Sequence, residues 1–287
     1  MRNKTDNFLR GLSGCSLVLS EKNTVTKYSS SLGYNDRLLR QAKKQEYFNT
    51  LNIPNIKCPA IFSIDSSSDL SSFDMEYISG NNYISFLEYA SMDYVNFFSA
   101  SLISYLDFLN TVKSEYYTES DFVQICKVKF DAIKNNAENK DFSDYLMEKI
   151  ISIKKPKIPI TFCHGDLTLS NILFSVDSLC FLDFLDSYIE SWVIDLIKIK
   201  QDLYYCWNIK RDVKDPSFRS IQISQSIWKK LETKYSWMIN SDEFKILEYL
   251  NFLRIYPYLN DESDILLLNQ IIKKTPIYEE FNNSNGR

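Results

Sequence analysis

Three short apolar runs typical of β-strands enclose a polar loop within residues 156–184, in a chain whose other long stretches have helical periodicity. The runs occupy residues 158–162, 172–174 and 179–182. On either side of them, from about residue 83 to 155 and again from Ile194 onward, apolar side chains recur at helical spacing. Strands and helices that are segregated along the chain in this way predict an α+β fold.

The N-terminal part of the chain combines strands with one helix. Strands are expected at residues 16–19, 25–28 and 73–78, and a helix at residues 36–51. After Gly80 the helical pattern takes over. We therefore expect two lobes: a small β-rich lobe over residues 1–80, with a hinge at 76–80, and a larger, mainly helical lobe over residues 81–287. A loose polar tail is expected from Glu279 onward.

The charge and cysteine content exclude several classes of protein. The net charge of −4 comes from 33 basic and 37 acidic side chains that are well mixed along the chain. Nucleic-acid binding needs a concentrated basic patch, and anionic membranes are disfavoured for the same reason. No run reaches the roughly 18 apolar residues of a membrane span, and no signal peptide is predicted. Six cysteines without C-x-x-C spacing indicate reduced thiols, so we expect a cytoplasmic protein without nucleic-acid or membrane partners.

The polar loop carries the residues that suggest chemistry. His164, Asp166 and Asn171 lie in it, and Asp183 ends the next strand-like run. A strand–loop–strand arrangement would bring the three oxygen-bearing side chains to one edge. Phosphoryl transfer needs a carboxylate to accept or orient a hydroxyl proton, and hard oxygen ligands to hold Mg²⁺ against a triphosphate.

Each of these residues also has a simpler interpretation when taken alone. Asp and Asn are common in tight turns. His164 is the only histidine of the chain, and a lone histidine beside apolar residues is more often structural than a metal ligand. The joint pattern H-G-D-x-x-x-x-N-I-L, followed by a strand and L-D-F, is improbable by accident.

This pattern resembles the catalytic loop of the aminoglycoside phosphotransferase and choline kinase superfamily, small-molecule kinases with a two-lobed, protein-kinase-like fold. The resemblance implies ATP and Mg²⁺ as cofactors, with Asp166 as catalytic base and His164 bracing the loop. Asn171 and Asp183 would hold the metal. Asp195 matches a further position, an aspartate that supports the loop from the next helix; an ordinary acid at a helix start is the alternative.

The resemblance also implies a nucleotide site in the N-terminal lobe. Ser13 and Gly14 lie where the family has its nucleotide-covering turn. Lys27 would bind the α- and β-phosphates and pair with Glu46 on the following helix, although both residue types are also common on solvated surfaces. Main-chain groups of Glu76 and Ile78 would bond the adenine at the hinge.

Two departures from related patterns matter. Asp183-Phe184-Leu185 lacks the glycine of D-F-G, and no A-P-E segment follows, which argues against a regulated protein kinase. Trp192 stands where family members often carry proline.

The acceptor site is expected between the catalytic loop and the C-terminal helices. Aromatic rings beside carboxylates suit a cation, and aromatic rings beside polar groups suit a sugar; the same rings can simply form core. Its candidate residues are Asp186, Glu190, Tyr204 and Trp207, with Tyr188, Trp192 and Tyr205 beside them.

These features predict a kinase that phosphorylates a hydroxyl group of a small metabolite, a sugar or an amino alcohol. The stretch 182–202 resembles family members encoded with surface-glycan genes. An aminoglycoside-resistance or choline-type kinase is the alternative for the substrate. A non-catalytic kinase-fold binding protein is the alternative for the class.

Overall fold

The computed structural model describes residues 8–10, 15–20, 23–66, 69–133 and 140–284, and it divides into two compact units. The first unit comprises Met1–Phe86 and His164–Asp186, and the second comprises Leu87–Cys163 and Ser187–Arg287. Residues 164–186 group with the N-terminal part because strand β10 (Leu179–Phe181) pairs in parallel with β4 (Ile56–Lys57). The division of function between residues 1–80 and 81–287 stays a prediction.

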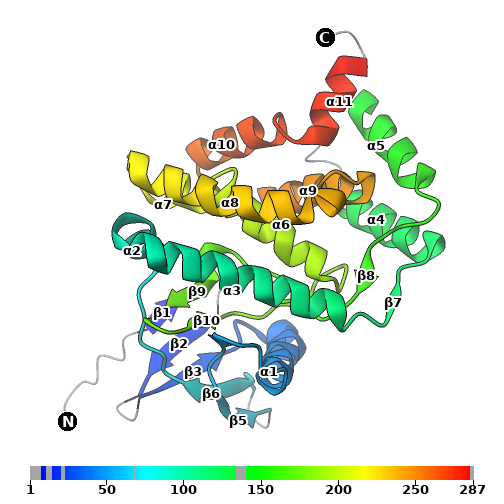
Figure 1. Cartoon of the computed structure of the whole chain (residues 1–287). Helices are drawn as coiled ribbons and strands as arrows, with labels where there is room; N and C mark the ends of the chain where they lie inside the picture. The colour runs from blue at the N-terminus through cyan, green and yellow to red at the C-terminus, as the bar shows by residue number, and fades with distance from the viewer. Residues whose placement is uncertain (1–7, 11–14, 21–22, 67–68, 134–139, 285–287) are drawn as a thin grey trace. The chain divides into compact units, whose positions relative to one another are not determined.

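A five-stranded antiparallel sheet forms the first part of the N-terminal unit (Figure 1), in the order β1-β2-β3-β6-β5. Its strands are β1 (Phe8–Arg10), β2 (Ser16–Leu19), β3 (Thr24–Tyr28), β5 (Ile61–Asp65) and β6 (Ser72–Glu76). The expected hairpin is present, since β2 pairs with β3 and Ser20 N–H bonds Thr24 O at 2.8 Å. In β6 the strand ends at Glu76 rather than at residue 78.

Helix α1 (Asn35–Thr50) follows the short 3₁₀ turn Leu32–Tyr34 and packs against β5 and β6. It buries Leu38, Gln41, Ala42, Gln45 and Phe48, a spacing of three and four that keeps one helix face toward the sheet. Leu38 and Ala42 join Cys15 and Phe73 in a core cluster. The helix predicted over residues 36–51 is confirmed, shifted by one residue at each end.

The second sheet of this unit supports the polar loop. Its order is β4-β10-β9, with β9 (Ile172–Phe174) antiparallel to β10. A single 3₁₀ turn, Leu169–Asn171, leads from the loop into β9. The side chains of Phe174 and Phe181 are buried, and their packing stabilises this sheet.

The other unit is helical (Figure 1). Its helices are α3 (Met92–Thr111), α4 (Glu119–Ile133), α5 (Lys140–Ser152), α6 (Trp192–Leu203), α7 (Trp207–Asp212), α8 (Phe218–Ile239), α9 (Asp242–Leu253), α10 (Glu262–Ile272) and α11 (Pro276–Ser284), with a 3₁₀ turn at Tyr256–Tyr258. A two-stranded ladder joins β7 (Glu115–Tyr116) to β8 (Pro159–Ile160), and the division between the units falls within α2 (Tyr83–Tyr89).

Serine begins several of these helices, which suits a chain with only six glycines. Ser91, Ser191, Ser217 and Ser241 are the N-cap residues of α3, α6, α8 and α9, and each hydroxyl accepts a bond from a backbone N–H of the first turn. Every residue of α6 is buried, since α3, α7, α8 and α9 all pack against it.

The C-terminal segment differs from its prediction. Instead of a loose tail from Glu279, α11 continues to Ser284. Ile277, Tyr278 and Phe281 are buried on one face of it, and the rings of Tyr278 and Phe281 pack against Phe142 of α5. Burial of these three side chains stabilises a helix that its polar residues alone do not suggest.

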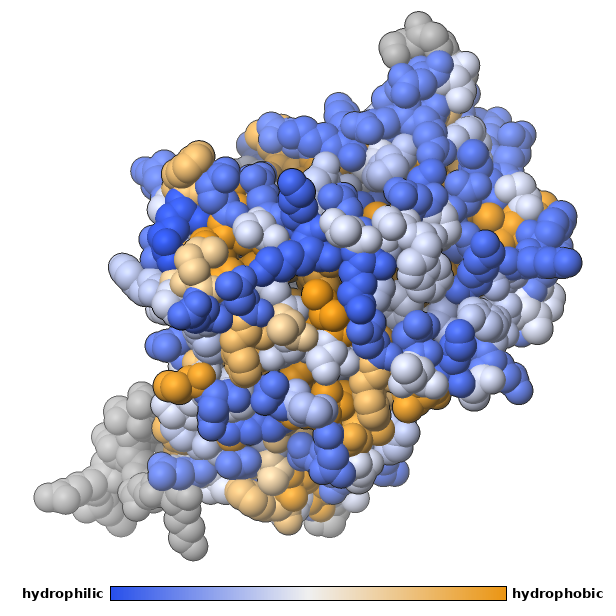
Figure 2. Space-filling model, in the orientation of Figure 1, coloured by the Kyte–Doolittle hydropathy of each residue, from blue (hydrophilic) through white to orange (hydrophobic). Residues whose placement is uncertain are grey.

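The α+β class is therefore confirmed. Hydrophilic residues cover most of the face shown in Figure 2, with apolar residues in patches between them. In the described parts of the chain, no helix is both long and apolar enough to cross a membrane.

Candidate active site

His164 braces the polar loop from within. The imidazole is fully buried; Nε2 lies 2.7 Å from Leu182 O, and Nδ1 accepts a bond from Asp166 N–H at 3.2 Å. Because a backbone N–H can only donate, Nδ1 is unprotonated and Nε2–H donates to the carbonyl. Burial lowers the pKa of His164 to about 4, so the ring is neutral at pH 7.

Asn171 holds the proposed base. Its Nδ2 donates to Asp166 O at 2.8 Å and to Asp166 Oδ2 at 3.2 Å. Thr168 N–H also bonds Asp166 O at 2.7 Å, which closes the turn that carries both side chains. The carboxylate is half-buried and has a defined orientation, as a general base requires.

Gly165 allows a close approach that no other residue tolerates. Its φ is +86°, and a Cβ there would lie 2.0 Å from Leu185 O. Beside this close approach, Leu185 N–H donates a hydrogen bond to His164 O at 2.9 Å. The loop and the segment after Asp183 are therefore packed backbone to backbone.

Asp183 lies next to Asn171 across the end of the β9–β10 hairpin. Leu182 N–H bonds Asn171 O at 2.9 Å, and Asp183 is the next residue. The Asp183 backbone is left-handed, with φ +61°, and its half-exposed carboxylate forms an ion pair with Lys27 of β3. One amide oxygen and one carboxylate are hard ligands that fit Mg²⁺, which keeps several waters. Among the described residues, no cluster of three or more His, Cys, Asp or Glu side chains could hold a metal.

Gln41, rather than Glu46, accompanies Lys27. Lys27 is 4% exposed and donates to Gln41 Oε1 at 3.0 Å, while Gln41 Nε2 donates to Tyr34 Oη at 2.9 Å. Glu46 is exposed. Five residues of helix turn Glu46 about 140° away from Gln41, so it points off the face that covers the sheet. The predicted Lys27–Glu46 pair is therefore wrong. Gln41 and Gln45 both lie within the apolar face of α1, so the sequence indicates a buried polar partner but does not choose between the two.

Of the four other residues predicted for the nucleotide site, the structure describes two, Glu76 and Ile78. Ser13 and Gly14 lie outside the described residues. Glu76 N–H bonds Ala60 O at 2.9 Å, and its side chain accepts from Ala60 N–H at 3.3 Å. In the part of the chain that the structure describes, the backbone of Ile78 makes no hydrogen bond.

Two of the predicted acceptor residues are acids with partners of their own. Asp186 forms an exposed ion pair with Arg40 of α1 at 2.5 Å. Glu190 accepts from Ser187 N–H at 2.9 Å and from Cys163 Sγ at 3.2 Å, so both of its carboxylate oxygens have contacts within its own unit.

The aromatic candidates belong largely to the core. Trp207 is 2% exposed and therefore has no face free for a ligand, whereas Tyr204 is half-exposed. Lys200 Nζ lies 5.5 Å from the Tyr204 ring centre and forms a buried ion pair with Glu248 at 2.7 Å. Burial raises the pKa of Glu248 and the charge of Lys200 opposes that shift. A cation of the chain itself thus already lies beside the Tyr204 ring.

Asp195 and Trp192 stabilise the start of α6. Asp195 is fully buried and accepts a bond from Tyr105 Oη of α3 at 2.6 Å. Trp192 is the first residue of the helix, and its N–H donates to Thr161 Oγ1 at 2.8 Å, a bond that proline could not make.

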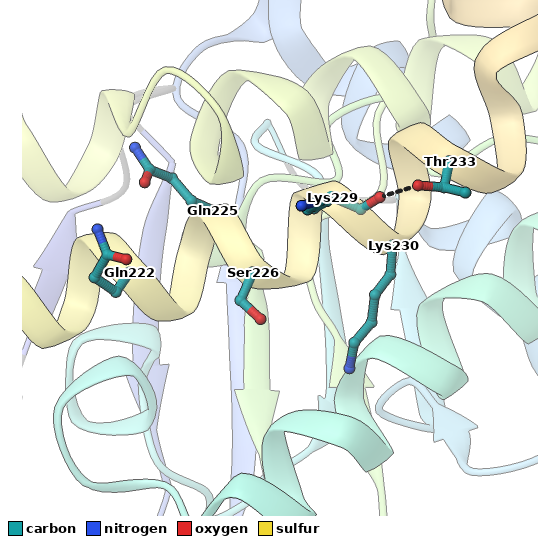
Figure 3. A pocket seen from close by; sticks show the side chains of 6 residues that line it. All are labelled: Gln222, Gln225, Ser226, Lys229, Lys230 and Thr233. Carbon is teal, nitrogen blue, oxygen red and sulfur yellow. Dashed lines mark hydrogen bonds between the residues drawn. The ribbon is translucent and has the colours of Figure 1, made fainter.

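A shallow hollow along α8 has no relation to these residues (Figure 3). Its wall consists of amide, hydroxyl and ammonium side chains from one face of the helix: Gln222, Gln225, Ser226, Lys229, Lys230 and Thr233. None of the predicted site residues lines it.

Comparison with protein families places the polar loop within a kinase-like pattern. The model of the ecdysteroid kinase-like family matches residues 79–218, which include Asp166, Asn171 and Asp183. A comparison with curated protein sequences gave no match.

Solved structures of small-molecule phosphotransferases share the fold over nearly the whole chain. The GDP complex of aminoglycoside 2'-phosphotransferase-IIIa is 11% identical, covers 95% of this chain and 93% of its own, and has a TM-score of 0.61. An aminoglycoside phosphotransferase from Streptomyces rimosus, solved with ADP and streptomycin, is 15% identical, with 85% and 93% covered and a TM-score of 0.51. A choline/ethanolamine kinase family protein from Mesorhizobium loti is 10% identical, with 96% and 91% covered and a TM-score of 0.52.

These likenesses confirm the expected resemblance and the two-lobed, protein-kinase-like fold.

Proposed function

We propose that this chain is an ATP- and Mg²⁺-dependent kinase that transfers the γ-phosphate to a hydroxyl of a small metabolite, a sugar or an amino alcohol. The observation that carries the proposal is the arrangement of three residues within one compact unit. Asn171 orients the carboxylate of Asp166, and the backbone bond from Leu182 to Asn171 sets Asp183 beside them. A base and two hard oxygen ligands at one loop edge are the parts that phosphoryl transfer requires.

Each residue has a role that follows from its contacts. Asp166 would accept the proton of the acceptor hydroxyl, and His164 would keep the loop in place without exchanging protons at neutral pH. Lys27 would hold the α- and β-phosphates, steered by Gln41. Asn171 and Asp183 would hold Mg²⁺, which, when bound, neutralises charge on the phosphates. The backbone of Ile78 is available for the adenine, as is typical of a hinge.

The ion pair between Lys27 and Asp183 would have to separate when the nucleotide and the metal bind. Lys27 now contacts the carboxylate that is proposed to hold the metal. When nucleotide and metal arrive together, the phosphates would supply a new partner for Lys27, and Asp183 would be released for Mg²⁺. Binding of nucleotide and metal should therefore be cooperative.

The acceptor is the open part of the proposal. An aminoglycoside or a choline-type acceptor is the alternative. It is considered because solved aminoglycoside phosphotransferases and a choline/ethanolamine kinase family protein share the fold.

The first prediction concerns Asp166. Asp166→Asn removes the base but keeps the side chain's shape, so nucleotide binding should stay nearly unchanged while turnover falls by at least ~10²-fold. ATP consumption is measured with and without a panel of sugars, amino alcohols and aminoglycosides. Asp177→Asn, at an exposed turn between β9 and β10, is the matched control and should behave as the unmodified chain.

The same assay separates the alternatives. Turnover of Asp166→Asn within a few-fold of the unmodified chain would remove Asp166 from its role. Tight nucleotide binding without turnover on any acceptor would favour the non-catalytic kinase-fold binding protein.

A further inference from the structure

Two basic side chains meet at one tyrosine in the helical unit. Lys129 lies on α4, and Arg254 is the C-cap residue of α9. Lys129 Nζ is 5.7 Å and Arg254 Cζ is 5.1 Å from the centre of the Tyr188 ring. Helices α4 and α9 pack against each other, so the two cations are brought together by the fold and not by sequence proximity (Figure 1).

Neither cation has an acidic partner among the residues that the structure describes. Within the described chain, neither Lys129 nor Arg254 forms an ion pair or a side-chain hydrogen bond, and Arg254 Nη1 is buried without a partner. Burial, and then the charge of Arg254, lower the pKa of Lys129 to about 8. The charge that acts on Lys129 is thus one of the same sign.

Lys200 shows how the chain normally accommodates such a group. It also lies beside aromatic rings, but Glu248 neutralises it at 2.7 Å. At Lys129 and Arg254 the ring of Tyr188 is present, but no carboxylate of a described residue pairs with either cation. Two partly desolvated like charges are costly without a counter-charge, and a cation–π contact offsets only part of that cost.

We propose that Lys129 and Arg254, beside the ring of Tyr188, form a binding site for a small oxyanion, a carboxylate or phosphate group. A guanidinium presents paired N–H donors that match both groups, and an ammonium adds a point charge. The Tyr188 hydroxyl is turned to Leu247 O at 3.4 Å, so the ring serves as an apolar wall and leaves recognition to the cations. This site goes beyond the proposed function and does not depend on it.

Calorimetry and thermal unfolding of the full chain test the site directly. Inorganic phosphate and malonate are titrated at constant ionic strength against chloride, because general screening acts on all exposed charges alike. Both anions should bind and raise the unfolding temperature. Lys129→Met should weaken binding by roughly tenfold or more, the scale of one hydrogen bond to a charged group.

Two further variants keep the result decisive. Lys127→Met removes a lysine of the same helix, two residues away and on another face, and should bind the anions as the unmodified chain does. Without anion, Lys129→Met should unfold at a higher temperature than the unmodified chain, since an uncompensated charge is gone. Arg254→Gln should likewise weaken binding. Absence of binding to the unmodified chain, or equal binding by Lys129→Met and Lys127→Met, would overturn the proposal.

The source of the anionic group is a separate question with its own measurement. If it belongs to the acceptor, Lys129→Met should lower kcat/KM for hydroxylated acids and sugar phosphates but not for their neutral counterparts. If neutral acceptors are preferred while calorimetry still shows phosphate binding, the site takes a free anion. If no acceptor is phosphorylated, the proposed function fails and the calorimetric result for the site still holds.

Discussion

At the scale of single residues, the proposed site depends on unusual backbone conformations as much as on side chains. Gly165 and Asp183 both have left-handed backbones, and Gly165 lies against Leu185 where a Cβ would collide. The glycine is readable from the motif. The left-handed Asp183 is not, since a non-glycine residue with positive φ carries a cost that only its surroundings can offset.

This conformation shapes the test of Asp183. Asp183→Asn keeps a residue type that tolerates left-handed backbone but removes the charge, so it should abolish phosphoryl transfer and weaken ATP binding only when Mg²⁺ is present. Asp183→Ala should do the same. Both variants leave the buried Lys27 without its carboxylate and so lose stability, and Asp183→Ala should lose roughly 1 kcal/mol more through backbone strain. Nucleotide titrations with and without Mg²⁺, alongside urea unfolding, measure both effects. Equal loss of ATP binding with and without the metal would contradict a metal-binding role.

The lone histidine gives a pH test of the bracing role. Its pKa is about 4 in the folded chain and about 6.5 when unfolded. Above pH 6.5 the imidazole of His164 is mostly neutral in both the folded and the unfolded chain. As pH falls from 6.5 to 4, only the unfolded state takes up the proton, so the free energy of unfolding should fall, by about 3 kcal/mol in total from this residue.

Urea unfolding between pH 7 and 4 measures this loss, with His164→Asn as the comparison. Because His164 is the only histidine, the difference between the two curves isolates its contribution. The difference should shrink as the pH drops. Parallel curves would mean that the imidazole is not held neutral.

At the scale of elements, α1 connects the sheet to the residues around Asp183. Its buried face supplies Gln41 to Lys27, and its other side supplies Lys44, whose Nζ donates to Leu185 O at 2.8 Å, and Arg40, which pairs with Asp186. One helix therefore contacts Lys27 of β3 and two residues, Leu185 and Asp186, of the segment that follows β10. All of these contacts lie within the N-terminal unit.

Gln41 is the residue through which α1 should affect the nucleotide. Gln41→Leu removes the acceptor for Lys27, so the KM for ATP should rise roughly tenfold and turnover should fall, with little change in the KM for the acceptor. Gln41→Glu places a second carboxylate near Lys27 and should weaken ATP binding while leaving adenosine binding unchanged. The exposed Glu46 offers the control, since Glu46→Gln should alter neither.

A double-variant cycle checks that the two residues act together. Lys27→Met and Gln41→Leu should combine less than additively in kcat/KM for ATP, because Gln41 acts through Lys27. Strict additivity, or a loss of adenosine binding equal to the loss of ATP binding, would assign Gln41 to packing alone.

At the scale of the whole molecule, the proposed nucleotide residues group in one compact unit although they come from distant parts of the sequence. Lys27 and Gln41 belong to Met1–Phe86, and Asp166, Asn171 and Asp183 belong to His164–Asp186. Mg²⁺–ATP should therefore slow amide hydrogen exchange most strongly in these two stretches, because a ligand stabilises the parts that it binds. Hydrogen exchange with mass spectrometry, with ADP alone and with Asp183→Asn as controls, measures this. Protection restricted to α8–α11 would place the nucleotide elsewhere.

Much of the fold could be predicted from local patterns. The strand at residues 172–174 and the helix at 36–51 were readable because the spacing of their apolar residues agrees with the faces that they bury. The residues of the polar loop could be proposed as a site because their spacing within a single loop is itself the signal. Contacts within such short segments need no knowledge of what lies across the sheet.

Pairings between distant segments required the three-dimensional structure. Sequence spacing cannot tell which of several polar residues on α1 faces Lys27, because a rotation of the helix by one residue exchanges Gln41 for a neighbour. Likewise, nothing local indicates that α11 packs against Phe142. Nor does it indicate that Lys129 and Arg254, separated by 125 residues, both lie beside the Tyr188 ring with no acidic partner among the described residues. Such contacts are made by packing between elements, and packing is a property of the folded chain as a whole.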